Sequence, residues 1–108
     1  MTYSELIEIA LELEGAEESF DKGNHSVLRK GRVMFWFQQK YQCVAMKMDW
    51  DSHDEFLAEY PEVFYKNDHF MSYPALLLLP ESLDAELARR AVAVSWADAP
   101  NKVKYRKG

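Results

Sequence analysis

The chain has 108 residues, 48% of them hydrophobic, and a formal net charge of −5. This length fits one domain with its own core, and the negative charge argues against a protein that coats nucleic acid without sequence preference. The single cysteine, Cys43, excludes an internal disulfide. The longest apolar run, residues 75–79, is too short to span a membrane. We therefore expect a soluble, cytoplasmic protein without a leader, and a monomer.

The chain opens with a predicted amphipathic helix. Thr2 can cap this helix, and Glu5, three residues later, can complete a capping box. Apolar residues then recur at helical spacing until Gly15, which is expected to end the helix. Residues 16–24 are acidic and contain Gly23, so they are predicted to form a loop or a short edge strand.

Residues 26–50 alternate as a β-meander around which the rest of the chain is expected to pack. A two-residue turn at Lys30 and Gly31 would place Leu28 opposite Val33, and Val27 opposite Met34. A second turn at residues 39–42 would connect the second strand of the meander to the third. The alternation then predicts a core face made of Leu28, Val33, Phe35, Phe37, Val44, Met46 and Met48. It predicts a second, basic face made of Val27, Arg29, Arg32, Met34, Trp36, Ala45 and Lys47.

The second half of the chain predicts two further strands and two further helices. Asp51 or Ser52 can cap a helix that Pro61 ends. Residues 63–66 are strand-like, and the consecutive leucines of residues 75–79 predict a strand covered on both faces. Ser82 or Asp84 can cap a last helix, which Pro100 stops. Residues 1–100 are thus one domain, and residues 101–108 form a basic tail that is expected to fray.

This order of elements defines the predicted fold. It is α-β-β-β-α-β-β-α, which predicts an α+β protein with two layers: an antiparallel five-stranded sheet with the helices on one face.

The order and spacing of several short segments resemble the MmcQ/YjbR family over residues 6–99. The matching segments are Glu14-Gly15-Ala16-Glu17-Glu18-Ser19, Lys30-Gly31-Arg32-Val33-Met34-Phe35, Lys47-Met48-Asp49, Tyr60-Pro61, and Leu83-Asp84-Ala85-Glu86-Leu87 with Trp96. The resemblance implies a compact CyaY-like or secretion-chaperone-like fold. It also implies a small bacterial protein of unestablished role that is commonly labelled DNA-binding. The chain has His69-Phe70 where many members have histidine followed by tryptophan.

The basic face is the first candidate site. Arg29, Arg32, Trp36 and Lys47 combine cations with an aromatic ring, which suits phosphate neutralisation and base stacking. Lys102, Lys104 and Arg106 of the tail could add attraction to DNA. The alternative is that these are ordinary solvated residues and that Trp36 packs against the protein's own chain.

A protein-binding surface is the second candidate. The apolar strand at residues 76–79, Trp36 and the aromatic loop at residues 70–73 could form a contact for a protein partner, as in a chaperone-like module.

Catalytic and metal sites are not predicted. The acidic row of Glu5, Glu8 and Glu12 could bind a divalent cation only if its oxygens converged, and an exposed helix disperses them. Ser52, His53 and Asp54 are adjacent at a helix start and do not make a triad. We therefore expect a non-enzymatic protein without a cofactor or metal.

Overall fold

The structure, a computed structural model, describes residues 1–107, apart from the side chain of Lys22. It is an α+β fold in which three helices accompany an antiparallel sheet of six strands in the order β1-β2-β3-β4-β6-β5. The helices and strands are α1 (Tyr3–Leu11), β1 (Ala16–Ser19), β2 (Ser26–Arg29), β3 (Arg32–Gln38), β4 (Cys43–Lys47), α2 (Trp50–Glu59), β5 (Phe64–Tyr65), β6 (Ala75–Leu78) and α3 (Ala85–Asp98). Short 3-10 turns lie at Asp21–Gly23, Asp68–Phe70 and Pro80–Ser82.

The sheet has one strand more than the five predicted. The extra strand is β1, which pairs with β2 from Ala16 opposite Arg29 to Ser19 opposite Ser26. Of the two alternatives predicted for residues 16–24, a short edge strand forms at residues 16–19, and its glutamates stay in solvent at the edge of the sheet. The order of elements is therefore α-β-β-β-β-α-β-β-α.

The helix caps agree in part with the prediction. Thr2 and Glu5 form the expected capping box on α1. On α2 the prediction of Asp51 or Ser52 was wrong, because Asp49 caps the helix by accepting a hydrogen bond from the Ser52 amide at 2.9 Å. Asp84 caps α3 through the Leu87 amide at 2.8 Å.

The turns of the meander lie where they were predicted. Lys30 and Gly31 have φ angles of 51° and 75°, which is the left-handed pair that a two-residue type I′ turn requires. Leu28 lies opposite Val33, and Phe35 lies opposite Met46, as the alternation predicted.

A β-bulge in the β2–β3 hairpin overturns the predicted faces. The register shifts between Val27 and Leu28, so Val27 lies opposite Phe35 and not opposite Met34. One extra residue in β3 reverses which side chains share a face, because side chains alternate with a period of two. Met34 and Phe35 both join the core under the helices.

In β2 and at the start of β3, the bulge therefore exchanges the side chains predicted for the core face with those predicted for the basic face. Leu28 and Val33, predicted as core, lie on the face of Trp36. Arg29 and Arg32 are cross-strand partners and share the opposite face. There Arg29 contacts Trp96 of α3. The two arginines and Trp36 are thus on opposite faces of the sheet.

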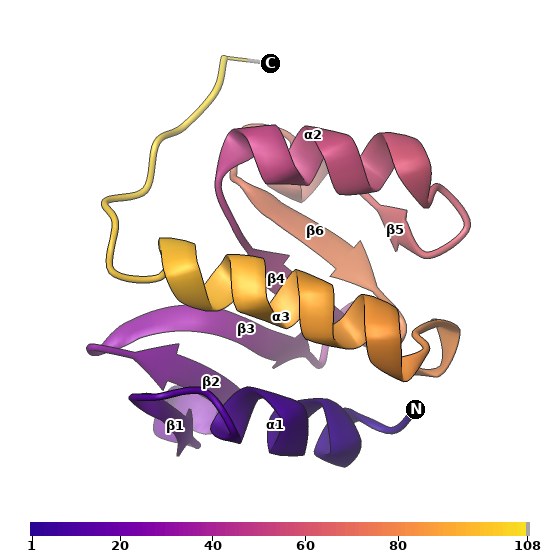
Figure 1. The fold of residues 1–108 in the computed structure, drawn as a ribbon. Helices are drawn as coiled ribbons and strands as arrows, with labels where there is room; N and C mark the ends of the chain where they lie inside the picture. The colour runs from indigo at the N-terminus through magenta and orange to yellow at the C-terminus, as the bar shows by residue number, and fades with distance from the viewer. Residues whose placement is uncertain (108) are drawn as a thin grey trace.

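The main core lies between the sheet and the three helices, which cover one face of the sheet in Figure 1. A smaller cluster on the reverse face joins Cys43, Ala45, Ala75 and Leu77 to Phe70, with Trp36 packed at its edge. All four residues of β6 are buried, as the run of leucines predicted. The segment from 68 to 74 thus covers the β4–β6 part of the reverse face and leaves the β2–β3 part open.

Candidate functional site

The open part of the reverse face carries two hollows that meet at Trp36. Each has a volume of about 340 Å³. The first is lined by Ser19, Asp21, Asn24, Ser26, Leu28, Gly31, Val33 and Trp36. The second is lined by Trp36, Gln38, His69, Phe70, Ser72, Tyr73 and Tyr105. We call these two sets of residues together the Trp36 groove.

The strands explain why these side chains share one surface. Ser26 lies opposite Trp36, which in turn lies opposite Ala45. Cross-strand partners point to the same side of a sheet, so Trp36 stands in the middle of the face with small neighbours on both sides. Small neighbours leave room beside the indole, which is why there is a hollow on either side of it.

The second hollow has aromatic walls that come from three separate segments. The Trp36 ring centroid lies 6.1 Å from that of Phe70 and 6.3 Å from that of Tyr73, with the Tyr73 ring nearly perpendicular. Tyr105, from the C-terminal segment, continues the row 5.8 Å from Tyr73. Phe70 is buried, whereas Tyr105 is 72% exposed. At these separations the rings contact one another, so they form one continuous aromatic wall of the second hollow.

The indole N–H of Trp36 differs from those of the other two tryptophans. Trp50 donates to the Lys104 carbonyl at 2.7 Å, and Trp96 donates to the Glu14 carbonyl at 2.6 Å. Among the described residues, the Trp36 indole has no acceptor. A half-buried donor of this kind can bind an acceptor on a ligand.

The predicted basic residues do not gather around Trp36. The Arg29 guanidinium lies 3.6 Å from the centre of the Trp96 ring and donates to the Trp96 carbonyl at 2.8 Å. Arg32 is exposed, on the same face as Arg29. Lys47 is 2% exposed and binds Asp98 at 2.9 Å. The prediction of a basic face around Trp36 is therefore wrong. The bulge places Arg29 and Arg32 on the opposite face of the sheet, and Lys47 is buried against Asp98 of α3.

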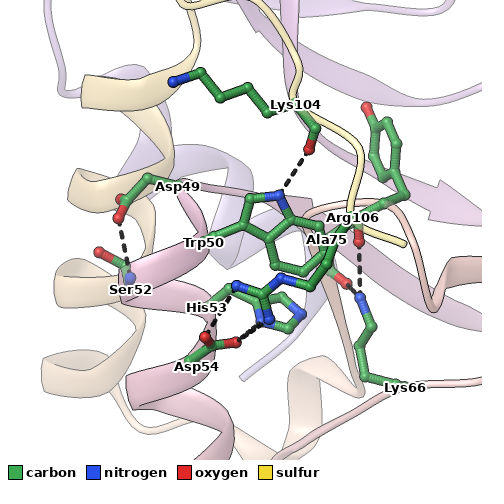
Figure 2. Close-up of polar contacts among 10 residues, drawn as sticks. Asp49, Trp50, Ser52, His53, Asp54, Lys66, Ala75, Lys104 and Arg106 are labelled. Atoms are coloured by element: carbon green, nitrogen blue, oxygen red, sulfur yellow. Dashed lines mark hydrogen bonds and ion pairs between the residues drawn. The ribbon is translucent and has the colours of Figure 1, made fainter. Parts of the chain in front are cut away.

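The C-terminal segment, for which the sequence left fraying open, contacts α2 from Lys104 to Arg106. Figure 2 shows the Lys104 carbonyl at the indole N–H of Trp50 and the Arg106 guanidinium against Asp54. Both guanidinium contacts measure 3.1 Å, and the same group lies 4.0 Å from the centre of the Trp50 ring. The Lys102 and Lys104 side chains remain exposed. Gly108, the last residue of the predicted tail, lies outside the described residues.

One bond connects this segment to the loop that lines the groove, and two more hold that loop in place. The Arg106 amide donates to the Ser72 carbonyl at 2.9 Å. The Lys66 ammonium donates to the Tyr73 and Ala75 carbonyls at 2.8 Å each, and burial lowers the pKa of Lys66 to about 8. The Tyr73 and Tyr105 walls of the groove are thus fixed through neighbouring backbone bonds.

Burial under the C-terminal segment favours a neutral histidine at position 53. His53 is 3% exposed and lies 2.9 Å from Asp54, while its Nε2 has no partner among the described residues. Burial, opposed in part by the hydrogen bond to Asp54, lowers the pKa of His53, and the nearby Lys66 and Arg106 lower it further. The hydrogen bond from Arg106, followed by that from His53, lowers the pKa of Asp54.

Metal-ligating side chains do not converge in the described part of the chain. Within residues 1–107 no group of three His, Cys, Asp or Glu residues could hold a metal ion. The acidic row is dispersed, since Glu12 binds Arg89 at 2.7 Å while Glu5 caps α1. Cys43 is buried in β4. None of the helices in residues 1–107 has the length and apolarity that crossing a bilayer requires.

Sequence reasoning found Trp36 and the 70–73 loop but missed the other walls. Leu28 and Val33 were assigned to the core because the bulge carries no sequence signal. Tyr105 was missed because nothing in a short basic tail indicates where it docks. The chain matches no protein-family model, no curated protein and no solved structure.

Proposed function

We propose that this is a non-enzymatic cytoplasmic binding protein of the MmcQ/YjbR type whose Trp36 groove binds an extended segment of a protein partner. The order of elements between α1 and α3 supports the family, because it contains the predicted succession of helices and strands with β1 added. The groove supports the binding role, because it is the part of the sheet that the chain's own helices and loops leave uncovered.

The lining of the groove favours protein over DNA. No lysine or arginine lines either hollow among the described residues. Asp21 lines the first hollow, and Glu17, opposite Leu28, adds a second exposed carboxylate on the same face. DNA binding depends on cations that neutralise phosphates, and carboxylates repel phosphates. This charge distribution is the single observation that carries the proposal.

DNA binding is the second candidate and rests on different residues. Arg32, Lys102 and Lys104 are exposed. Arg29, Lys47 and Arg106 are already bound to groups of the same chain, so they would have to break those contacts to reach a phosphate.

Peptide display on the immobilised protein tests the proposal. We expect selected peptides to bind the wild type and to lose at least about tenfold in affinity on Trp36→Ala, as for a central aromatic contact. Tyr65→Ala is the matched control, since Tyr65 is an exposed tyrosine of the sheet that lines neither hollow. Peptides that bind Trp36→Ala and the wild type equally would contradict the proposal.

The same preparations, titrated with a fluorescent DNA duplex at low and high salt, compare the two candidates. We expect no saturable DNA binding. Binding that weakens steeply with salt and is lost in Arg32→Glu would favour the DNA function instead.

A further inference from the structure

The geometry of the Trp36 groove points to a proline-rich segment in the polyproline II conformation, with a basic residue at one end, as the partner that it binds. This inference rests on the proposed function, because it names the chemistry of the segment that the groove would take. Three independent features of the groove support it: the aromatic wall of the second hollow, the unused indole donor and the carboxylates at the first hollow.

The aromatic wall of the second hollow suits proline rings. Polyproline II segments are recognised in grooves lined by aromatic side chains, which pack against the flat, apolar pyrrolidine rings. Here Trp36, Tyr73 and Tyr105 contact one another in a row, with centroids 6.3 Å and 5.8 Å apart, and all three line the second hollow. Successive proline rings of a ligand can pack along this row inside the hollow.

The unused indole donor suits the backbone of such a segment. A polyproline II helix has no internal hydrogen bonds, so its carbonyl oxygens are free to accept. The Trp36 indole is the one tryptophan donor in residues 1–107 without a protein acceptor, because Trp50 and Trp96 donate to backbone carbonyls. A free donor next to this aromatic wall provides the directional bond that packing alone lacks.

The first hollow favours a positively charged residue in the bound segment. Asp21 and Glu17 are exposed carboxylates beside the apolar Leu28 and Val33. A lysine or arginine can lay its aliphatic stem over Leu28 and Val33 and bring its charged end to the carboxylates. A segment lying across Trp36 would therefore carry its prolines at the Tyr73 end and its cation at the Asp21 end.

Other ligands fit the groove less well. Nucleobases could stack on the same rings, but their phosphates would meet carboxylates and, among the side chains that the structure describes, no lining lysine or arginine. A small organic cation could bind the ring faces, but it has no carbonyl for the indole. The test therefore also measures binding of a nucleic acid and of a small organic cation.

The experiment titrates the full-length, ¹⁵N-labelled protein with three synthetic peptides and follows the indole signal of Trp36. The first peptide is acetyl-KPPPLPP-amide, the second has every proline replaced by alanine, and the third has its lysine replaced by glutamate. We expect saturable binding of the first, at least about tenfold weaker binding of the second, because its disordered chain must be fixed on binding, and about threefold weaker binding of the third.

Two protein variants and a control locate the contacts. Trp36→Phe keeps a ring but removes the donor, and we expect about tenfold weaker binding of the first peptide, the value of one hydrogen bond. Tyr105→Ala removes the exposed end of the aromatic wall of the second hollow and should also weaken binding. Tyr65→Ala should leave binding unchanged.

Several results would overturn the inference. Equal binding of the proline and alanine peptides, or tighter binding of choline or a single-stranded oligonucleotide than of the first peptide, would each refute it. If the display-selected peptides bind through Trp36 while acetyl-KPPPLPP-amide does not bind, this inference fails and the proposed function stands. If neither binds, both fail.

Discussion

The two faces of the β2–β3 hairpin differ although their residues alternate along the same strands. On the helix-covered face, Val27, Met34 and Phe35 are fully buried. On the open face, Leu28, Val33 and Trp36 are only partly buried. Adjacent residues therefore lie in different surroundings: Phe35 packs in the core, and Trp36 lines the groove. The comparison teaches that a single bulge decides which side chains hold the fold and which are free for a partner.

The largest expected effect comes from the core side of this comparison. Phe35→Ala should lower the free energy of unfolding by about 3–5 kcal/mol, because it removes a fully buried aromatic ring. Trp36→Ala should lower it by less, about 1–2 kcal/mol, because its ring is half-buried. Urea unfolding of both variants measures the difference. Equal losses would contradict the assignment of the two faces.

The next largest effect is expected at Lys47, which was predicted to lie on an exposed basic face and is buried. Asp98→Ala leaves Lys47 buried without its partner and should lower the free energy of unfolding by about 3 kcal/mol. Glu86→Ala, at an exposed acid of the same helix, is the control and should change it by less than about 0.5 kcal/mol. If Asp98→Ala leaves the free energy of unfolding unchanged, Lys47 reaches solvent, as the prediction of a basic face required.

Acid should loosen the C-terminal segment that supplies the Tyr105 wall. The pKa of His53 is lowered, so its contribution to stability is present above pH 6.5, the ordinary histidine value, and is lost as pH falls toward the lowered value. The pKa of Asp54 is also lowered, and its contribution is lost at still lower pH. The Trp50 indole signal, followed from pH 7.5 to pH 3, reports the release.

Variants of the same segment sharpen this prediction. His53→Gln should remove the upper of the two transitions. Arg106→Gln should weaken docking at neutral pH by about 0.2–1 kcal/mol, since its pair with Asp54 is half-exposed. Lys102→Gln changes a cation of the same segment that makes no ion pair among the described residues and should have no effect. A Trp50 signal that is independent of pH would contradict the arrangement.

The smallest expected effect comes from Arg32. Arg32→Glu should change the free energy of unfolding by less than about 0.5 kcal/mol, because the side chain is exposed. It should also leave peptide binding at the Trp36 groove unchanged, because Arg32 lies on the other face of the sheet. Loss of binding, measured by the same indole titration, would place Arg32 at the groove.

Local signals in the sequence were sufficient for much of the fold. Thr2 with Glu5, and Lys30 with Gly31, act within four residues, so their chemistry predicts the first cap and the tight turn directly. The run of leucines in β6 predicted a strand buried on both faces, because no polar residue interrupts it. The α+β class and the antiparallel pairing followed from the order of these elements.

Trp36 and the 70–73 loop were predicted, but the other walls of the candidate site could not be, because they depend on two non-local features. The bulge at Val27 and Leu28 accommodates both Met34 and Phe35 under the helices, and apolar residues on either side of it give no sign of the slip. The docking of Tyr105 and Arg106 depends on Trp50 and Asp54, about 50 residues earlier in the chain. Both features emerge only from tertiary packing.

Cross-strand nuclear Overhauser contacts in the β2–β3 hairpin test the reversal of the faces most directly. We expect contacts of Val27 with Phe35, and of the Arg29 side chain with the Trp96 ring. Contacts of Val27 with Met34, together with contacts of Arg29 with Trp36, would restore the arginines to the open face and contradict the groove described here.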